Sequence, residues 1–434
     1  MSFSISLFQY WFVVVLVIPS LFLIGIYLTF KLKLIQLRKL HVGIRALFDR
    51  EREAQGDISN YEAVAAVLAG NLGAGNISGM AIALSTGGPG ALFWMWVMAF
   101  LGAAFKYCGC FLGVKYRQKD EEGHYVGGPM YYLSKGAKAP LLAALFSLFT
   151  IVGAFTVGNM VQIHSMTQPL QGFSLSPMLF SLLMALLVGA VLVREFERFT
   201  LIASAVVPVM ACFYLIGCGY VIVSHWQNVP EALYMMLQSA FSVGSCLKGG
   251  ACYAFVHTVS VGFERGIFAT DAGVGLAPIL QSAARTRGPS EEGIVAMVAP
   301  LLVVIVCTIT MLMLVVTGAY SHPGLQSTDM CIWAFATAMP AQLAFLMITA
   351  TIVLFGYTTM LAWAYCMGRA VQYLFGLKWV QPLNWVFILF IPLGAVCDYQ
   401  IAWLVADLSM SCMLIVNIWG LLKLSREVFI PSER

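Results

Sequence analysis

Long apolar stretches free of charge set the pattern of this chain. No Asp, Glu, Lys or Arg occurs in residues 1–30, 63–105, 140–193, 199–230, 293–328 or 330–368. A helix needs about 20 apolar residues to cross the hydrocarbon core of a bilayer, so several of these stretches are long enough for two crossings. Strands of membrane barrels are much shorter, at about 10 residues. The pattern therefore predicts an all-α polytopic membrane protein with about eleven transmembrane helices.

Composition supports a lipid environment. Hydrophobic residues make up 60% of the 434 residues and charged residues only 10%, whereas soluble domains carry about 25% charged residues. The first apolar stretch has neither the basic start nor the cleavage site of a signal peptide, so we expect it to be retained as a helix. The 11 cysteines form no CxxC pair and are expected to be small buried residues. The net charge of +4 follows from topology and does not predict nucleic-acid binding.

Basic residues are concentrated in every second loop of the predicted topology. Seven of them fall in 31–52, and others follow in 115–138, whereas none occurs in 85–90, 168–174, 225–231, 319–329 or 398–400. Loops rich in Lys and Arg stay in the cytoplasm. The distribution predicts a multi-pass membrane protein with the N-terminus outside and the C-terminus in the cytoplasm.

Two glycine-rich interruptions fall inside predicted spans. The first, residues 70–79, holds four Gly and two Asn, and the second is 244–250. Each glycine costs a helix about 1 kcal/mol relative to alanine, and an interrupted backbone in the membrane is tolerated where it lines a polar cavity. Paired interruptions in two halves of opposite orientation indicate the central site of a transporter. The alternative is that these glycines allow close helix packing.

The predicted organisation follows from this pairing. It comprises an N-terminal helix and loop (1–58), a first five-helix repeat (59–226), a second five-helix repeat (227–424) and a cytoplasmic tail (425–434). Half-helix N-termini suit a carboxylate, while free carbonyls suit an ammonium group or sodium. Because glycine lets the backbone approach its ligand closely, we expect a small zwitterionic substrate.

Residues 87–96, Gly-Gly-Pro-Gly-Ala-Leu-Phe-Trp-Met-Trp, resemble the signature of the bacterial alanine or glycine:cation symporter family, also called the sodium:alanine symporter family. Residues 73–79, 127–133, 265–273 and 359–363 are similar to other segments of that family. The resemblance implies a leucine-transporter-like 5+5 inverted repeat with an extra N-terminal helix. It also implies uptake of alanine or glycine with sodium or a proton, and no organic cofactor.

The same resemblance implies the site residues. Substrate-binding positions would be Gly73, Ala74, Gly75, Asn76, Gln162, Gly249, Gly250 and Trp363, to which we add Lys248 because of its charge. A cation site, for sodium, would combine carbonyls of the first interruption at Asn71 with the hydroxyls of Thr358 and Thr359.

The sequence departs from the family pattern at several positions. Ala74 stands where the family usually has Thr, and residues 270–273 read Thr-Asp-Ala-Gly in place of Asn-Glu-Ala-Gly. Lys248 precedes a glycine pair, and a charge at this depth costs about 2.5–3.5 kcal/mol. It would either bind near the cation site or the substrate carboxylate, or pair with free carbonyls without a role in transport. These changes leave the ligand and the coupling ion open.

Several neighbouring residues have a plainer interpretation. Trp363 could serve packing alone, and Thr358 and Thr359 could donate back to carbonyls of their own helix. We expect residues 262–278 to form a surface helix or gate segment, with Glu264, Arg265 and Asp271 either as a cytoplasmic ion-pair latch or simply as solvated charges.

Taken together, the sequence predicts a symporter for a small neutral amino acid, held in a lipid bilayer. One alternative is a proton-coupled or cation-independent permease or exchanger in which Lys248 replaces the coupling ion. A membrane enzyme or sensor is the remote alternative, because no nucleophile–base pair, HExxH motif or P-loop is present. The substrate, its chirality and the oligomeric state stay open at this point.

Overall fold

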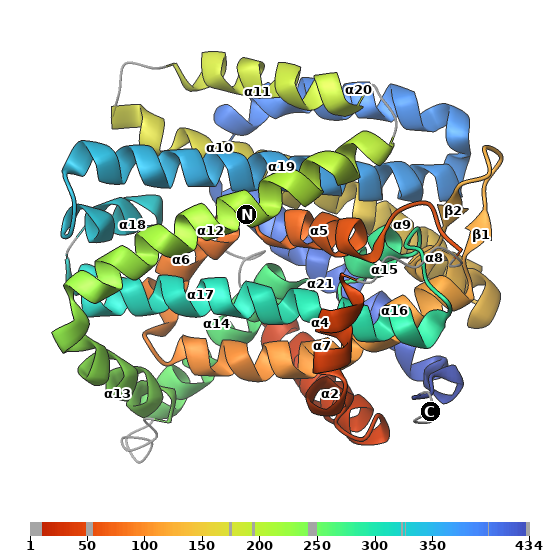
Figure 1. The fold of residues 1–434 in the computed structure, drawn as a ribbon, viewed down its shortest axis with the longest axis horizontal. Coiled ribbons are helices and arrows are strands. Elements are labelled where there is room, and N and C mark those ends of the chain that lie inside the picture. The colour runs from red at the N-terminus through yellow and green to blue at the C-terminus, as the bar shows by residue number, and fades with distance from the viewer. Residues whose placement is uncertain are drawn as a thin grey trace.

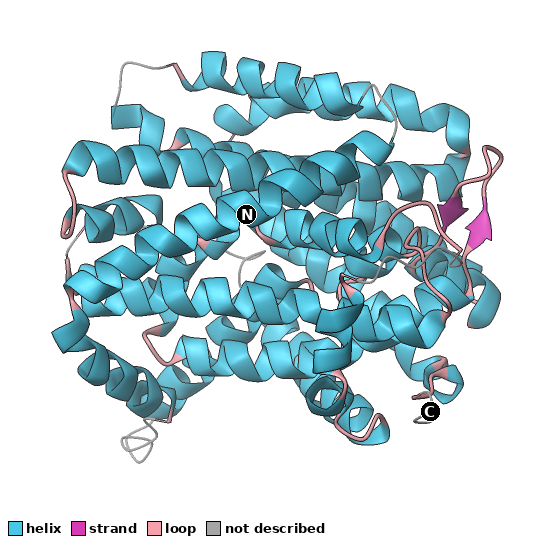
Figure 2. Ribbon diagram, in the orientation of Figure 1, coloured by secondary structure: helices cyan, strands magenta, loops and turns pink. Residues whose placement is uncertain are grey.

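The computed structural model describes residues 11–48, 55–172, 176–192, 196–241, 250–322, 324–325, 327–397 and 399–430. Helices make up nearly all of this part of the chain (Figure 2). The strands found there are β1 (Gln118–Lys119) and β2 (Tyr125–Val126), which pair antiparallel with Gln118 opposite Val126.

The helices of the first 228 residues begin with the N-terminal span and include the long helix α12. In order, they are η1 (Val13–Val17), α2 (Ile18–Lys31), α3 (Ile35–Arg38), α4 (Leu40–Ala46), α5 (Asn60–Asn71), η2 (Ala74–Asn76), α6 (Ser78–Gly87), α7 (Ala91–Lys115), α8 (Pro129–Tyr131), η3 (Tyr132–Gly136), α9 (Pro140–Phe155), η4 (Thr156–Met160), α10 (Val161–Thr167), η5 (Pro169–Gly172), α11 (Pro177–Leu192), α12 (Phe196–Ser224) and η6 (Trp226–Asn228).

The described residues of the rest of the chain are also mainly helical. Its helices are α13 (Val229–Ala240), α14 (Gly250–Thr270), α15 (Leu276–Gln281), α16 (Pro289–Ala296), α17 (Val298–Val316), η8 (Ala319–Ser321), α18 (Ser327–Ala336), α19 (Ala341–Phe375), η9 (Leu377–Trp379), α20 (Val380–Phe390), η10 (Ile391–Ala395), α21 (Tyr399–Lys423) and η11 (Ser425–Glu427).

Eight helices of the described chain are long and apolar enough to cross a membrane. A ninth apolar helix, Pro177–Leu192, is shorter. The interrupted pairs α5–α6 and α14–α15 are not among the eight. The architecture confirms a polytopic all-α protein, while the number of about eleven spans stays a prediction.

The bundle has two distinct ends. Figure 1 shows the β1–β2 hairpin, α8 and α16 at one end, together with the C-terminus, and α13 and α18 at the other. α7 is the most enclosed of the eight membrane-length helices and packs against α14 and α16. Two glycines of α7 let the segment after α14 approach closely: a Cβ added at Gly102 would lie 2.4 Å from the Cβ of Ala272, and one at Gly109 would lie 2.8 Å from Cγ of Pro278 in α15.

The first predicted interruption is confirmed by the break between α5 and α6. The second stays a prediction, because residues 242–249, which contain most of it, lie outside the described residues. In the described chain the second half is interrupted at 271–275, between α14 and α15. The expectation that 262–278 forms a surface segment is wrong, because Phe263, Ala272 and Val274 are at most 1% exposed. These apolar side chains face neighbouring helices, so the segment is part of the core.

Candidate functional site

The first interruption separates α5 from α6 by six residues. α5 begins with a capping box between Ser59 and Glu62 and ends at Asn71, after which Gly73 is extended with φ −99° and ψ −177°. One 3-10 turn, η2, follows, and the Ser78 hydroxyl closes it by donating to the Ala74 carbonyl at 2.7 Å. Four Gly in ten residues make continuous helix costly here, and the freed backbone groups face the protein interior.

Gln162 holds the first interruption in place. Its Oε1 accepts a hydrogen bond from the Ala74 amide at 3.1 Å, and its Nε2 donates to the Val157 carbonyl at 3.0 Å. The side chain is 1% exposed. Val157 lies in η4, a π-helical turn between α9 and α10, and such turns free a carbonyl from the regular helical pattern. Gln162 therefore joins two irregular segments.

The second interruption is built around Asp271. Its backbone adopts a left-handed conformation with φ +53°, and its side chain is 3% exposed. Oδ2 accepts hydrogen bonds from the amides of Leu276 and Ala277, at 3.1 and 3.2 Å, and from Lys106 Nζ at 3.2 Å. The carboxylate thus satisfies amides at the start of α15 and pairs with a buried ammonium group.

Direct hydrogen bonds connect the two interruptions to each other and to α19. Asn71 Nδ2 donates to the Thr270 carbonyl at 3.1 Å, from one interrupted helix to the other. The Thr359 hydroxyl donates to the Ala69 carbonyl at 2.8 Å. The Thr358 hydroxyl instead donates within its own helix, to the Phe355 carbonyl at 3.0 Å. Only Thr359 of the two therefore bonds to the first interrupted helix.

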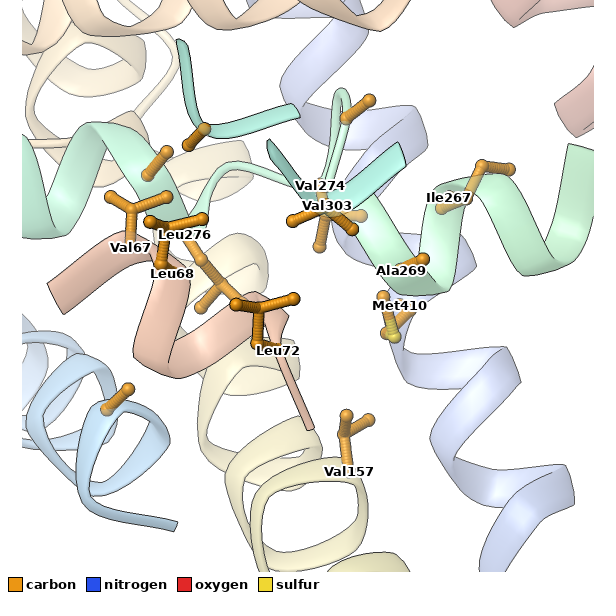
Figure 3. Close-up of a cluster of buried hydrophobic side chains, with 14 of the residues drawn as sticks. Val67, Leu68, Leu72, Val157, Ile267, Ala269, Val274, Leu276, Val303 and Met410 are labelled. Carbon is orange, nitrogen blue, oxygen red and sulfur yellow. The ribbon is translucent and has the colours of Figure 1, made fainter. Parts of the chain in front are cut away.

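A narrow cavity lies where these segments meet. It is lined by Gly70, Asn71, Gly73, Val157, Gln162, Phe268, Asp271, Leu276, Thr359, Trp363 and Met410. Figure 3 shows part of the surrounding apolar cluster, in which Leu72, Val157, Leu276 and Met410 come from four different segments. The cavity thus combines an apolar wall with amide, hydroxyl and carboxylate groups, the mixture expected where a small polar ligand is oriented.

Five of the residues predicted from sequence line this cavity: Asn71, Gly73, Gln162, Thr359 and Trp363. Ala74, Gly75 and Asn76 belong to the same interruption, although the Asn76 amide group is used by Asn71 and Cys307. Thr358 is buried beside Met210.

Of the predicted glycine pair and the lysine before it, the structure describes only Gly250. Lys248 and Gly249 lie outside the described residues, and Gly250 is the first residue of α14. At 1.5 Å per residue, Gly250 lies roughly 30 Å along that helix from the second interruption.

Sequence reasoning missed three important residues of the site. Asp271 and Phe268 were assigned to a surface segment, and Lys106 was not considered. The signal for Asp271 was present in the departure at 270–273, because an acidic residue beside two glycines at Gly273 and Gly275 also describes a break with a functional side chain. Lys106 carried its own signal, as a single charge within a long apolar helix.

Comparisons with known proteins agree with this geometry. Residues 2–432 match the model of the sodium:alanine symporter family. An uncharacterized transporter of Haemophilus influenzae is 35% identical over 94% of this chain and 90% of that protein. The sodium/alanine symporter AgcS of Methanococcus maripaludis is 34% identical over 93% and 90%. The probable sodium/glutamine symporter GlnT of Bacillus subtilis is 30% identical over 95% and 86%.

Among solved structures, the fold is similar to the substrate-bound, outward-open state of a Na⁺-coupled sialic acid symporter. The TM-score is 0.59 at 12% sequence identity, and the alignment covers 92% of this chain and 86% of the other. At this identity the likeness establishes the fold alone. It confirms the predicted leucine-transporter-like fold class.

Proposed function

The chain belongs to the sodium:alanine symporter family, and we propose that it imports a small neutral amino acid, alanine or glycine, together with sodium. The members of this family are transporters and not enzymes, and the apolar helices make this chain a multi-pass membrane protein. The observation that carries the proposal is the meeting of two interrupted helices at one polar-lined cavity. Transport would follow from one helix bundle rocking against the other around this site.

The first interruption offers donors for the substrate carboxylate. The amides of Leu72, Asn76 and Ile77 donate to backbone carbonyls, and that of Ala74 donates to Gln162. The amides of Gly73 and Gly75 have no hydrogen-bond acceptor among the described residues. Of the two, Gly73 lines the cavity, and a free backbone amide beside a cavity can bind an anionic oxygen. We assign them to the carboxylate, with Gln162 fixing the loop that presents them.

The walls of the cavity select a small side chain. Val157, Phe268, Leu276, Trp363 and Met410 are its apolar lining. Phe268 packs so close to the first interruption that a Cβ at Gly75 would lie 2.4 Å from its ring. A larger substrate would have to displace these packed rings, which favours alanine or glycine.

The oxygen atoms beside α19 suit a sodium ion. The Thr359 hydroxyl oxygen and the Ala69 carbonyl oxygen lie 2.8 Å apart, and Asn71 ends the same helix. Carbonyl and hydroxyl oxygens are the ligands that hard cations prefer. The proposed set therefore comprises the Ala69 and Asn71 carbonyls with the hydroxyls of Thr359 and, from the resemblance, Thr358.

The membrane placement belongs to the same proposal. We place the chain in the bacterial inner membrane with its N-terminus outside, and its two repeats at 59–226 and 227–424. Lys248 stays a prediction, and replacing it with alanine should leave sodium dependence unchanged if it only pairs with carbonyls.

Purified protein in liposomes tests the function directly. We expect uptake of labelled alanine or glycine that is driven by an inward sodium gradient and not by a proton gradient alone. Uptake of neither amino acid under either gradient would refute the substrate, and uptake driven only by protons would refute the ion.

A pair of variants at Thr359 tests the ion site. Thr359→Val removes the hydroxyl at nearly constant volume, and we expect the sodium concentration for half-maximal uptake to rise about tenfold, as for loss of one interaction with a charged group. Thr359→Ser keeps the hydroxyl and should stay close to the wild type. Equal sodium dependence of the two variants would exclude Thr359 from the ion site.

A further inference from the structure

Only one oxygen of the Asp271 carboxylate has hydrogen-bond partners among the described residues. Oδ2 accepts all three hydrogen bonds, from Leu276 N, Ala277 N and Lys106 Nζ. Oδ1 is buried and has no partner among the residues that the structure describes. A buried oxygen of this kind costs free energy unless a donor reaches it. Oδ1 is therefore a strong hydrogen-bond acceptor that a ligand could use.

This acceptor belongs to a residue of the cavity wall. Asp271 lines the cavity together with Gly73, Gln162 and Thr359, and it supplies the single carboxylate in that lining. The Asn71 bond to the Thr270 carbonyl holds the residue before Asp271 against the first interruption. The unpartnered carboxylate oxygen and the free Gly73 amide therefore belong to two residues that line the same small cavity.

Lys106 makes such a carboxylate compatible with a zwitterion. Its side chain is 1% exposed, and its ammonium group pairs with Asp271 from the α7 side, so the pair adds no net charge to the cavity. A carboxylate left alone at this depth would be costly to ionise, and it would favour a cation over a zwitterion. The pair thus fixes the orientation of the carboxylate, while Oδ1 keeps no partner among the described residues.

We propose that Oδ1 of Asp271 accepts a hydrogen bond from the ammonium group of the transported amino acid, which makes Asp271 the residue that selects substrates with a free α-amino group. The inference rests on the proposed function, since it names the ligand chemistry of the same cavity. The substrate carboxylate faces the Gly73 and Gly75 amides, and its ammonium group faces the second interruption.

The test compares ligands that differ only in the amino group. Binding of alanine and of propionate to purified protein, each measured by the ligand-induced rise in thermal midpoint, separates the contribution of the ammonium group. In Asp271→Asn we expect alanine affinity to fall about 10- to 100-fold, the range for a hydrogen bond to a charged group. Propionate affinity should stay within about twofold, because propionate makes no bond to Oδ1. Asp271→Glu keeps a carboxylate and should retain a preference for alanine.

A purely structural role for Asp271 predicts different results. The double variant Lys106→Met/Asp271→Asn removes both charges, so it leaves no unpaired buried ion and serves if the single variant fails to fold. We expect it to fold and still to lack the preference for alanine over propionate. If the double variant regains that preference, or if alanine and propionate lose affinity equally, the proposal is overturned.

The sodium requirement of Asp271→Asn gives a second test of the proposal. If Asp271→Asn raises the sodium requirement while the alanine-to-propionate ratio stays at the wild-type value, the carboxylate belongs to the ion and the proposal fails. If the wild type binds neither alanine nor glycine, the proposed function itself fails. If the wild type binds them and Asp271→Asn keeps their preference over the deaminated analogue, only the present inference fails.

Discussion

The packing of Trp363 against η4 gives a prediction about stability whose magnitude follows from the structure. This side chain is 2% exposed and lines the cavity while packing against η4. A Cβ added at Gly158 would lie 2.2 Å from Cβ of Trp363 and 2.6 Å from its Cγ. Ordinary carbon contacts begin at 3.4 Å, so the contact is short by 1.2 Å, the difference between 3.4 and 2.2. Rotating the indole ring does not relieve it, because Cβ is fixed by the backbone of α19.

Gly158→Ala should therefore push η4 and α19 apart. Extra atoms in a packed core cost about 1–3 kcal/mol, which corresponds to a fall of a few degrees in the thermal midpoint. Because the same shift moves the Trp363 wall and the Val157 carbonyl that holds Gln162, we also expect weaker alanine binding. The measurement is the midpoint of thermal unfolding in detergent, with and without alanine.

Gly219→Ala is the matched control. Gly219 lies in α12, and a Cβ there meets no atom within 4 Å, so the substitution should only add helix propensity of about 1 kcal/mol. Its midpoint should equal or exceed that of the wild type. If Gly158→Ala matched this control in both midpoint and alanine binding, the close seating of Trp363 against η4 would be refuted.

Two further predictions concern charges away from the cavity. Burial alone would raise the pKa of Asp120, but a 3.0 Å hydrogen bond from Gln372 and a 3.2 Å ion pair with Arg369 hold that pKa below its ordinary value of 3.8. Asp120 therefore stabilises the fold above pH 3.8 and loses this contribution as the pH falls below it. Asp120→Asn should lower the thermal midpoint at pH 7, and a deficit that did not shrink toward pH 3 would contradict this linkage. Glu292 is fully buried, and neither carboxylate oxygen has a partner among the described residues. Glu292→Gln should keep or raise the midpoint, whereas a marked fall would indicate an ion pair that the structure does not show.

The first interruption could be predicted because its cause is local. Gly70, Gly73, Gly75 and Gly79 lower helix propensity within ten residues, and no distant contact is needed to explain the break. Gln162 and Trp363 came from the family resemblance, and the structure places both in the cavity lining.

The second interruption shows where local reasoning fails. Residues 242–249, which hold most of the predicted break, lie outside the described residues, and a break that was not predicted falls at 271–275. There it depends on distant partners: Lys106 pairs with Asp271, and the amide of Asn417 donates to the Gly273 carbonyl at 2.8 Å. Such long-range contacts leave no periodic trace in the sequence, so the charged residues of this segment were assigned to the surface.

The hydrogen bond from Asn71 to Thr270 has a mechanical consequence. It fastens α5 to α14 at the depth where both helices are broken. A rearrangement that separates the two broken helices must break this bond, whereas a movement of both together keeps it. The Thr359–Ala69 hydrogen bond ties α5 to α19 as well, so a joint movement of α5 and α14 relative to α19 would break that bond instead.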